Sequence, residues 1–165
     1  MKKVLRVRIS EHVVAKDHER LKSYGLGSCI GLVIYDPQKK IGAMAHVLLP
    51  NAAGARARPK SAKYASSAVN LLVEELARAG CGGKTLLAKI AGGANMFPEK
   101  FNLSCGGPGR SIGERNVRAV KAALARRKVR LVSEEVGGEC GRTVEFNPRT
   151  GEMIVYKSSG EVKVI

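Results

Sequence analysis

The chain contains no tryptophan, and aromatic residues make up only 4% of its 165 residues. Few aromatic side chains leave little surface for the base stacking on which single-strand nucleic-acid binding relies. No apolar run approaches the roughly 20 residues that a membrane-spanning helix needs. Arg6 and Arg8 interrupt the first apolar stretch, so it lacks the continuous core of a signal peptide. We therefore expect a cytoplasmic protein with no membrane insertion and no nucleic-acid partner.

Acidic residues are scarce relative to basic ones. The chain has 14 Asp and Glu against 29 Lys and Arg, which gives a formal net charge of +15 at pH 7. Such an excess favours an acidic partner, whether nucleic acid, an anionic membrane or an acidic protein surface. The basic residues form no compact block of the kind that marks a nucleic-acid-binding tail. Solubility alone would also account for the charge.

Paired cysteines are absent as well. The cysteines are widely spaced and form no CxxC pair, which counts against zinc-ribbon and thioredoxin-type sites. They are Cys29, Cys81, Cys105 and Cys140. In a reducing cytoplasm we expect free thiols rather than disulfides. Most free cysteines are buried as small apolar residues, so a catalytic thiol has to be argued from the residues around it.

The apolar segments that the chain does contain suit one globular domain over residues 1–165. Apolar runs and alternation predict strands at 4–10, 29–36, 41–50, 84–94, 129–138 and 161–165, with a hairpin at 142–158. Helical spacing predicts helices at 64–80 and 112–128. The remaining stretches are interpreted as loops at 51–63 and 95–111, and as an irregular loop or a short helix at 11–24. Mostly β segments with two helices inserted predict an α/β (α+β) sandwich, in which the helices pack on mixed sheets.

Residues 24–50, YGLGSCIGLVIYDPQKKIGAMAHVLLP, place a cysteine and a histidine on one predicted hairpin. If residues 37–40 form a four-residue loop, Gly31 pairs with His46. Cys29 and His46 are then diagonal neighbours on one face of the sheet, within about 7–8 Å of each other. The missing side chain of Gly31 would leave room for the imidazole. A loop of odd length would instead turn His46 to the opposite face.

A neighbouring thiol and imidazole suit nucleophilic catalysis. A free thiol has a pKa of about 8.5 and becomes a strong nucleophile as the thiolate. An imidazole can take its proton and return it to a leaving amine. The small residues before Cys29, including Gly27 and Ser28, let backbone N–H groups stabilise an oxyanion. A hydroxyl such as that of Ser23 or Ser28 could orient His46. The alternative is a packed core, in which both side chains are simply buried.

The string GLGSCIGLVIYDPQKKIGAMAHVLLP resembles the signature of the CheD family, the chemoreceptor glutamine deamidases. The likeness continues in order through KYASSAVNLLVEEL, AKIAGGANMF, IGERNVRAV, EEVGGECGR and VEFNPRTGE, and so covers nearly the whole chain.

The resemblance implies an enzyme that hydrolyses selected glutamine side chains of methyl-accepting chemotaxis receptors to glutamate and ammonia. It implies a fold likened to papain-type and toxin deamidases, with no metal and no organic cofactor. The family's nucleophile falls on Cys29 and its histidine on His46. Its third member, usually threonine, falls on Ser23, which keeps the hydroxyl but loses the methyl group.

The resemblance also implies a possible protein partner. In some lineages the family binds CheC, a phosphatase of the response regulator CheY. Met96 and Phe97 are hypothesised to form a docking loop for such a partner, although packing of Phe97 in the core is an alternative of at least equal weight. We expect a monomer. The alternative function is a non-catalytic binding module that regulates a CheC-type phosphatase.

Overall fold

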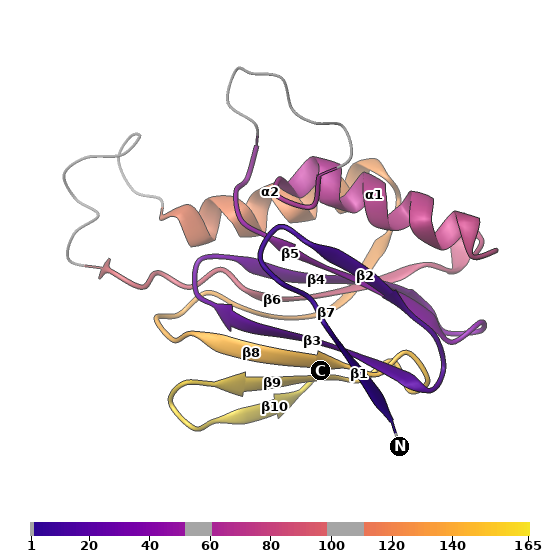
Figure 1. The fold of residues 1–165 in the computed structure, drawn as a ribbon. Coiled ribbons are helices and arrows are strands. Elements are labelled where there is room, and N and C mark those ends of the chain that lie inside the picture. Colours follow the sequence, from indigo (N-terminus) through magenta and orange to yellow (C-terminus); the bar gives the residue numbers. More distant parts are fainter. Residues whose placement is uncertain (1, 52–60, 99–110) are drawn as a thin grey trace.

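The computed structural model describes residues 2–51, 61–98 and 111–165 and arranges them in three layers, as Figure 1 shows. Within these residues, two helices cover one face of a five-stranded sheet. The other face of that sheet packs on a second five-stranded sheet. The result is a mixed α+β sandwich, as the sequence predicts.

Both sheets combine parallel and antiparallel pairs. The helix-covered sheet has the order β2 (His12–Ala15), β5 (Ile41–Val47), β4 (Ile30–Asp36), β6 (Leu87–Gly92) and β7 (Arg130–Val136). The outer sheet has the order β1 (Lys3–Arg6), β3 (Glu19–Leu26), β8 (Arg142–Phe146), β9 (Met153–Lys157) and β10 (Val162–Val164). The pairs β6–β7 and β1–β3 are parallel, and the other pairs are antiparallel.

The two helices form where helical spacing and end signals predict them. Helix α1 (Ala65–Arg78) buries an apolar stripe that includes Ala68, Val69, Leu72 and Leu76. It ends before Gly80, whose φ of +85° suits a residue without a side chain. Helix α2 (Ile112–Arg126) is capped at its N-terminus by Ser111, whose side chain accepts a hydrogen bond from the Glu114 N–H at 3.2 Å. Both helices pack on the same sheet.

Strand β4 lies at the centre of the helix-covered sheet and is buried along its whole length. Ile30, Leu32 and Ile34 face the helices. Val33 and Tyr35 face the outer sheet. Cover on both faces explains why this strand reads as a continuous apolar run rather than an alternating one.

The prediction for residues 11–24 is wrong, because this stretch contains β2 and most of β3. Strand β3 does alternate, because Leu21 and Ser23 are buried while their neighbours Arg20, Lys22 and Tyr24 are more exposed. The alternation is hard to recognise in the sequence because one of the buried positions holds a serine. A register shift between Ser23 and Leu26 interrupts the period further.

The other predicted elements are confirmed with shifted ends. The strand expected at 84–94 begins at Leu87, because Gly83–Thr85 form a short 3-10 turn, η1. The strand expected at 4–10 ends at Arg6. The predicted loops at 51–63 and 95–111 lie largely outside the described residues, and Cys105 lies outside them entirely.

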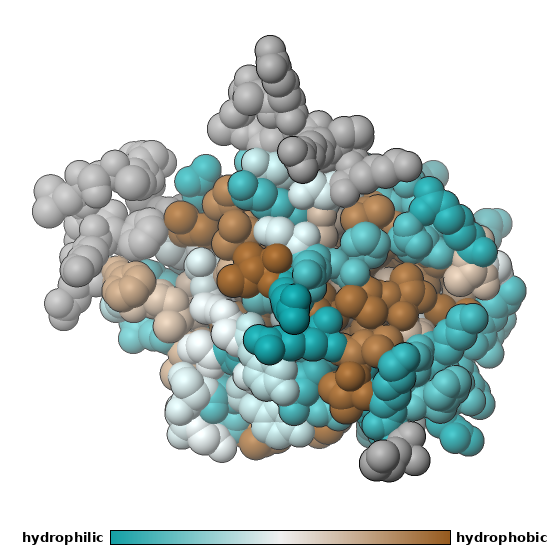
Figure 2. Space-filling view, viewed as in Figure 1, coloured by the Kyte–Doolittle hydropathy of each residue, from teal (hydrophilic) through white to brown (hydrophobic). Residues whose placement is uncertain are grey.

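The surface mixes polar and apolar residues. Figure 2 shows apolar residues gathered in patches that hydrophilic residues border. Exposed large apolar side chains include Ile9, Tyr24, Met96 and Phe97. Neither described helix is long and apolar enough to cross a membrane.

The core between the sheets should be sensitive to cavities. Phe146 is 0% exposed, and its ring centroid lies 5.1 Å from that of Tyr35. Phe146→Ala should lower the free energy of unfolding by about 3–5 kcal/mol. Val162→Ala on the exposed edge strand is the control and should change it by less than about 0.5 kcal/mol. Urea unfolding measures both, and equal losses would contradict this packing.

Candidate active site

The hairpin that carries the cysteine and the histidine has the predicted register. Residues 37–40 form the four-residue loop, and Asp36 pairs with Ile41. Asp36 Oδ1 accepts hydrogen bonds from the backbone N–H groups of Gln38 and Lys39, at 2.9 and 3.1 Å, which fixes the turn. Counting back along the ladder pairs Gly31 with His46.

This register brings Cys29 and His46 to the same face of the helix-covered sheet. Cys29 lies in the bend just before β4 and packs in the core between the two sheets. His46 points to the same side, because its Nδ1 lies 2.8 Å from Ser23 Oγ on the outer sheet. His46 is 1% exposed and Cys29 is 7% exposed, so a small part of the thiol residue reaches the surface.

Ser23 fixes which nitrogen of His46 carries the proton. The Ser23 hydroxyl donates to the Val7 carbonyl at 2.8 Å. A hydroxyl has one proton, so Ser23 Oγ can only accept from His46. Nδ1 is therefore the protonated ring nitrogen and Nε2 carries the lone pair. This is the tautomer that a general base acting through Nε2 requires.

His46 Nε2 is buried and has no hydrogen-bond partner among the described residues. Burial lowers the pKa of His46 below its ordinary value of 6.5. Burial also raises the pKa of the Cys29 thiol above 9.0, against a smaller lowering from its own backbone N–H. Both shifts favour the neutral forms, a thiol and a neutral imidazole, over a thiolate–imidazolium ion pair.

The end of β6 holds the turn around Cys29. The Gly93 N–H donates to the Cys29 carbonyl, and the Ala94 N–H donates to the Gly27 carbonyl, both at 2.9 Å. Gly92 has a φ of +118°, and a Cβ there would lie 2.1 Å from the Cys29 carbonyl oxygen. Only glycine permits so close a backbone approach.

Gly31 was predicted to leave room for the imidazole of His46, but it makes room for other side chains. A Cβ at Gly31 would lie 2.9 Å from Leu26 Cδ1 and 3.2 Å from Val144 Cγ2. The space therefore accommodates side chains of the outer sheet, and the imidazole is not among the three nearest groups. Gly31 sets how closely the two sheets approach beside the hairpin.

The backbone N–H groups near the thiol differ in their freedom to donate. The Gly27 N–H donates to the Gly25 carbonyl at 3.1 Å. The N–H groups of Ser28 and Cys29 make no hydrogen bond to another described residue. As donors to an oxyanion, Ser28 and Cys29 are thus better placed than Gly27.

Met96 and Phe97, the predicted docking residues, are both exposed. A Cβ at Gly27 would lie 3.1 Å from Met96 Cγ, so Met96 packs on the turn that precedes Cys29. Because Phe97 is exposed, the alternative that it packs in the core is wrong. A docking role for the pair stays a prediction.

Sequence reasoning missed how Asn116 is used. Its side chain is 0% exposed on the inner face of α2, and Nδ2 donates to the carbonyls of Ser28 and Leu48 at 2.8 and 3.1 Å. The available signal was a polar residue four positions before the buried Val120, on the apolar face of the helix.

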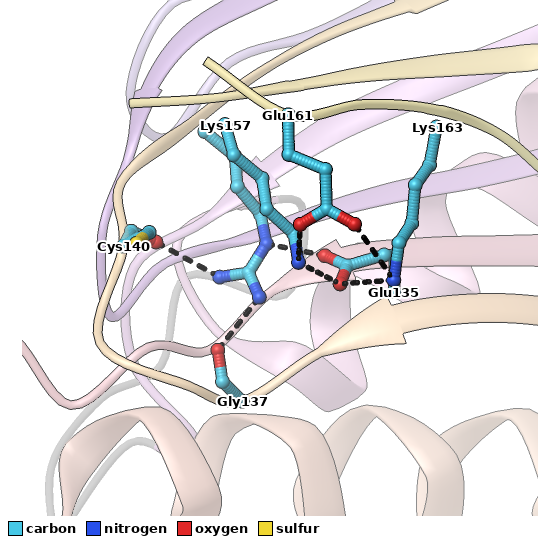
Figure 3. A network of polar contacts seen from close by, with 7 residues as sticks. Glu135, Gly137, Cys140, Lys157, Glu161 and Lys163 are labelled. Atoms are coloured by element: carbon cyan, nitrogen blue, oxygen red, sulfur yellow. Dashed lines mark hydrogen bonds and ion pairs between the residues drawn. The ribbon is translucent and has the colours of Figure 1, made fainter. Parts of the chain in front are cut away.

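A second missed feature is an ionic network at the start of β8. Arg142, which is buried, donates to Glu135 Oε2 at 2.6 Å and to the carbonyls of Gly137 and Cys140 at 2.7 and 3.0 Å. Figure 3 shows the side chains of Lys157 and Lys163 pointing toward Glu135. Lys157 Nζ lies 2.8 Å from Glu135 Oε1. Burial would raise the pKa of Glu135, but the hydrogen bonds from Lys157 and Arg142 lower it overall.

This network is connected to the cysteine turn through two short loops. The Gly137 N–H donates to the Gly92 carbonyl at 3.0 Å, and the Asn95 N–H donates to the Gly138 carbonyl at 2.8 Å. Gly92 in turn lies against Cys29. Among the described residues, no group of three or more His, Cys, Asp or Glu side chains could hold a metal ion.

The fold and the site define a class: an α+β protein with a buried thiol and imidazole on one hairpin. The chain matches the family model described as CheD chemotactic sensory transduction over residues 48–157. It is 47% identical over 164 residues to the probable chemoreceptor glutamine deamidase CheD 2 of Geobacter metallireducens, with 99% of each chain covered. It is 44% identical over 160 residues to the chemoreceptor glutamine deamidase CheD of Thermotoga maritima, with 97% of this chain and 94% of that one covered. The chain belongs to the CheD family.

The neutral resting pair predicts how Cys29 reacts with pH. Because the thiolate is the reactive form and burial raises the pKa of the thiol, the rate of alkylation by iodoacetamide should reach half its maximum above pH 9.0, the midpoint of an ordinary thiol. Proton transfer to His46 should persist below pH 6.5, because burial opposes protonation of the imidazole. Mass spectrometry of the Cys29 peptide measures the rate, with Cys29→Ala as the blank. A plateau reaching down to about pH 4, as a preformed thiolate–imidazolium pair gives, would contradict the neutral pair.

Proposed function

We propose that the chain hydrolyses glutamine side chains of chemoreceptors to glutamate, with Cys29 as nucleophile and His46 as general base. The Ser23–His46 hydrogen bond carries this proposal, because it leaves the Nε2 lone pair on the side of the sheet where Cys29 lies. Membership of the family and the printed names of the relatives support the reaction and the substrate. The likeness to papain-type and toxin deamidases stays a prediction.

The first half of the proposed reaction releases ammonia. Cys29 Sγ attacks the side-chain amide carbon of glutamine while His46 Nε2 takes the thiol proton. The C=O π electrons move to oxygen, and the backbone N–H groups of Ser28 and Cys29 stabilise the oxyanion. When the C–N bond breaks, protonated His46 gives its proton to the leaving nitrogen. Ammonia and a thioester on Cys29 are the products of this half.

The second half restores the thiol. Water attacks the thioester carbon while His46 Nε2 takes one of its protons. The resulting tetrahedral intermediate collapses with cleavage of the C–S bond, and His46 returns the proton to Cys29. The sum is glutamine plus water giving glutamate plus ammonia. Ser23 holds the imidazole in one tautomer through both halves, because its only proton is committed to Val7.

A basic hollow on the segment that contacts Ser23 and His46 suits an acidic substrate. It is lined by Arg6, Val7, Arg8, Ile9, Glu11 and Tyr24. The same segment contacts the catalytic residues through its backbone. The Val7 carbonyl accepts from Ser23, and the His46 N–H donates to the Glu11 carbonyl at 3.1 Å. Arg6 and Arg8 would steer glutamate-rich receptor helices toward this face.

The alternative function, a binding module that regulates a CheC-type phosphatase, has one observation in its favour. Met96 and Phe97 are exposed, and Met96 packs on Gly27 beside the catalytic turn. A partner bound there would also cover the thiol. Binding there would therefore inhibit deamidation while the partner is bound, and a CheC partner, like the monomeric state, stays a prediction.

The three proposed catalytic side chains should rank by their roles. Cys29→Ala should abolish conversion of glutamine to glutamate in a receptor cytoplasmic fragment. His46→Ala should slow it by about 10²–10⁴-fold through loss of the base. Ser23→Ala should slow it less, because the imidazole keeps its place and loses only its tautomer control. Mass spectrometry of the fragment measures the conversion. Full activity of Cys29→Ala, or a larger loss in Ser23→Ala than in His46→Ala, would contradict these roles.

The basic hollow can be tested with two variants of equal charge change. Arg8→Glu should lower kcat/KM for the receptor fragment by about 3–10-fold at low salt, and the loss should shrink as salt rises. Lys40→Glu is the control, since Lys40 lies at the far end of the hairpin, roughly 20 Å from Cys29 along β4. It should cause less than about a twofold change. Equal losses in the two variants would assign the effect to net charge rather than to this face.

A further inference from the structure

Asn116 makes contacts that a merely packed asparagine would not need. Its fully buried Nδ2 donates to two carbonyls, those of Ser28 and Leu48. Its Oδ1 is buried and has no hydrogen-bond partner among the described residues. Burying an amide with an unsatisfied oxygen is costly. An apolar residue would avoid that cost, so the two hydrogen bonds that Nδ2 donates indicate the role of the Asn116 side chain.

The first bond controls the direction of the Cys29 N–H. Ser28 C=O and Cys29 N–H belong to one peptide group, and the described residues contain no cis peptide bond. In a planar trans peptide these two bonds point in opposite directions. Asn116 draws the Ser28 carbonyl toward α2, so the Cys29 N–H points away from α2. The core between the sheets, which contains Cys29, lies on that side.

The second bond links this peptide to the histidine strand. Leu48 follows His46 by two residues, directly after β5. One amide group therefore ties the turn before Cys29 to the end of the strand that carries His46. The hydrogen bond to Leu48 fixes the position of the Asn116 side chain relative to the hairpin. The hydrogen bond to Ser28 fixes the plane of the peptide between Ser28 and Cys29.

We propose that Asn116 is a positioning residue that aims the Cys29 N–H at the oxyanion formed when Cys29 adds to a carbonyl. The inference rests on the proposed thiol mechanism but not on the identity of the substrate. In the addition step the Sγ–C bond forms, the C=O π pair moves to oxygen, and the thiol proton passes to His46. The Cys29 N–H then donates to that oxygen. Alkylation of the same thiol forms no oxyanion and does not use this donor.

The test compares these two reactions in Asn116→Asp, Asn116→Ala and a control, Asn70→Ala. Asn70 lies on α1, and its Oδ1 accepts a hydrogen bond from Arg127 at the C-terminal end of α2, so the control also removes an amide that contacts α2. Iodoacetamide alkylation reports the thiol and His46. The small aldehyde N-acetylglycinal adds reversibly to Cys29, and the thiol proton ends on the aldehyde oxygen. The degree to which the aldehyde protects Cys29 from iodoacetamide measures the affinity of the aldehyde. Removing an oxyanion donor costs about 10²–10³-fold in kcat. Because Asn116 acts through the peptide, we expect both Asn116 variants to bind the aldehyde about 10–100-fold more weakly. Alkylation should stay within about twofold, and Asn70→Ala should match the wild type in both reactions.

Unchanged aldehyde affinity in a folded Asn116 variant would overturn the proposal. So would a parallel loss of alkylation, which indicates a purely structural role. If both variants unfold, a crystal structure of the wild-type aldehyde adduct decides: the adduct oxygen must lie within hydrogen-bond distance of the Cys29 N–H while Asn116 still holds Ser28. An oxygen turned away from that N–H would overturn the proposal. Neither reaction involves a receptor, so a failure here is distinguishable from an absence of glutamine hydrolysis.

Discussion

The hydrogen bond between Ser23 and His46 crosses from the outer sheet to the helix-covered sheet, and the catalytic proposal depends on it. It forms only if the sheets pack at the right distance and if both strands hold their register. The Val7 carbonyl, just after β1, removes the remaining freedom by taking the one proton of Ser23. The tautomer of a single imidazole is thus determined by the packing of two sheets. A slip of one residue in either strand would turn its side chain to the opposite face.

The thiol is held by a different set of contacts, all made to backbone groups. The end of β6 binds the Cys29 and Gly27 carbonyls, and Asn116 on α2 binds the Ser28 carbonyl. Behind β6, the buried Arg142 holds the Gly137 and Cys140 carbonyls and is itself neutralised by Glu135. Removing one partner of such a buried ion pair typically costs about 3–5 kcal/mol. The nucleophile therefore lies on a loop, but one with little freedom to move.

Much of this arrangement can be predicted from the sequence, because the hairpin and the helices are determined by residues that lie close together in the chain. The apolar runs around DPQKK determine a hairpin, and a four-residue loop then determines which residue faces His46. Both helices are marked by their spacing and by Gly80 and Ser111 at their ends. The mixed two-layer sheet arrangement follows from mostly β segments with two helices inserted.

Prediction of secondary structure and contacts from the sequence fails where a buried position holds a polar residue that has a role at the candidate site. The sequence does not reveal strand β3, because the polar Ser23 interrupts the alternation of apolar residues. It does not reveal the role of Asn116, because the partners of that side chain are distant in the sequence. Such failures are expected at functional sites, where a local rule gives way to chemistry. Gly31 illustrates a subtler failure: the need for a small residue was predicted, but Leu26 and Val144 of the outer sheet could not be foreseen as its neighbours.

The central claim concerns one proton, and nitrogen NMR of protein labelled with ¹⁵N-histidine observes it directly. Its His46 signals can be assigned against a His46→Gln variant, which separates them from those of His12 and His18. At neutral pH the account predicts a neutral ring with the proton on Nδ1 and a bare Nε2. A proton on Nε2, or a doubly protonated ring at neutral pH, would contradict it.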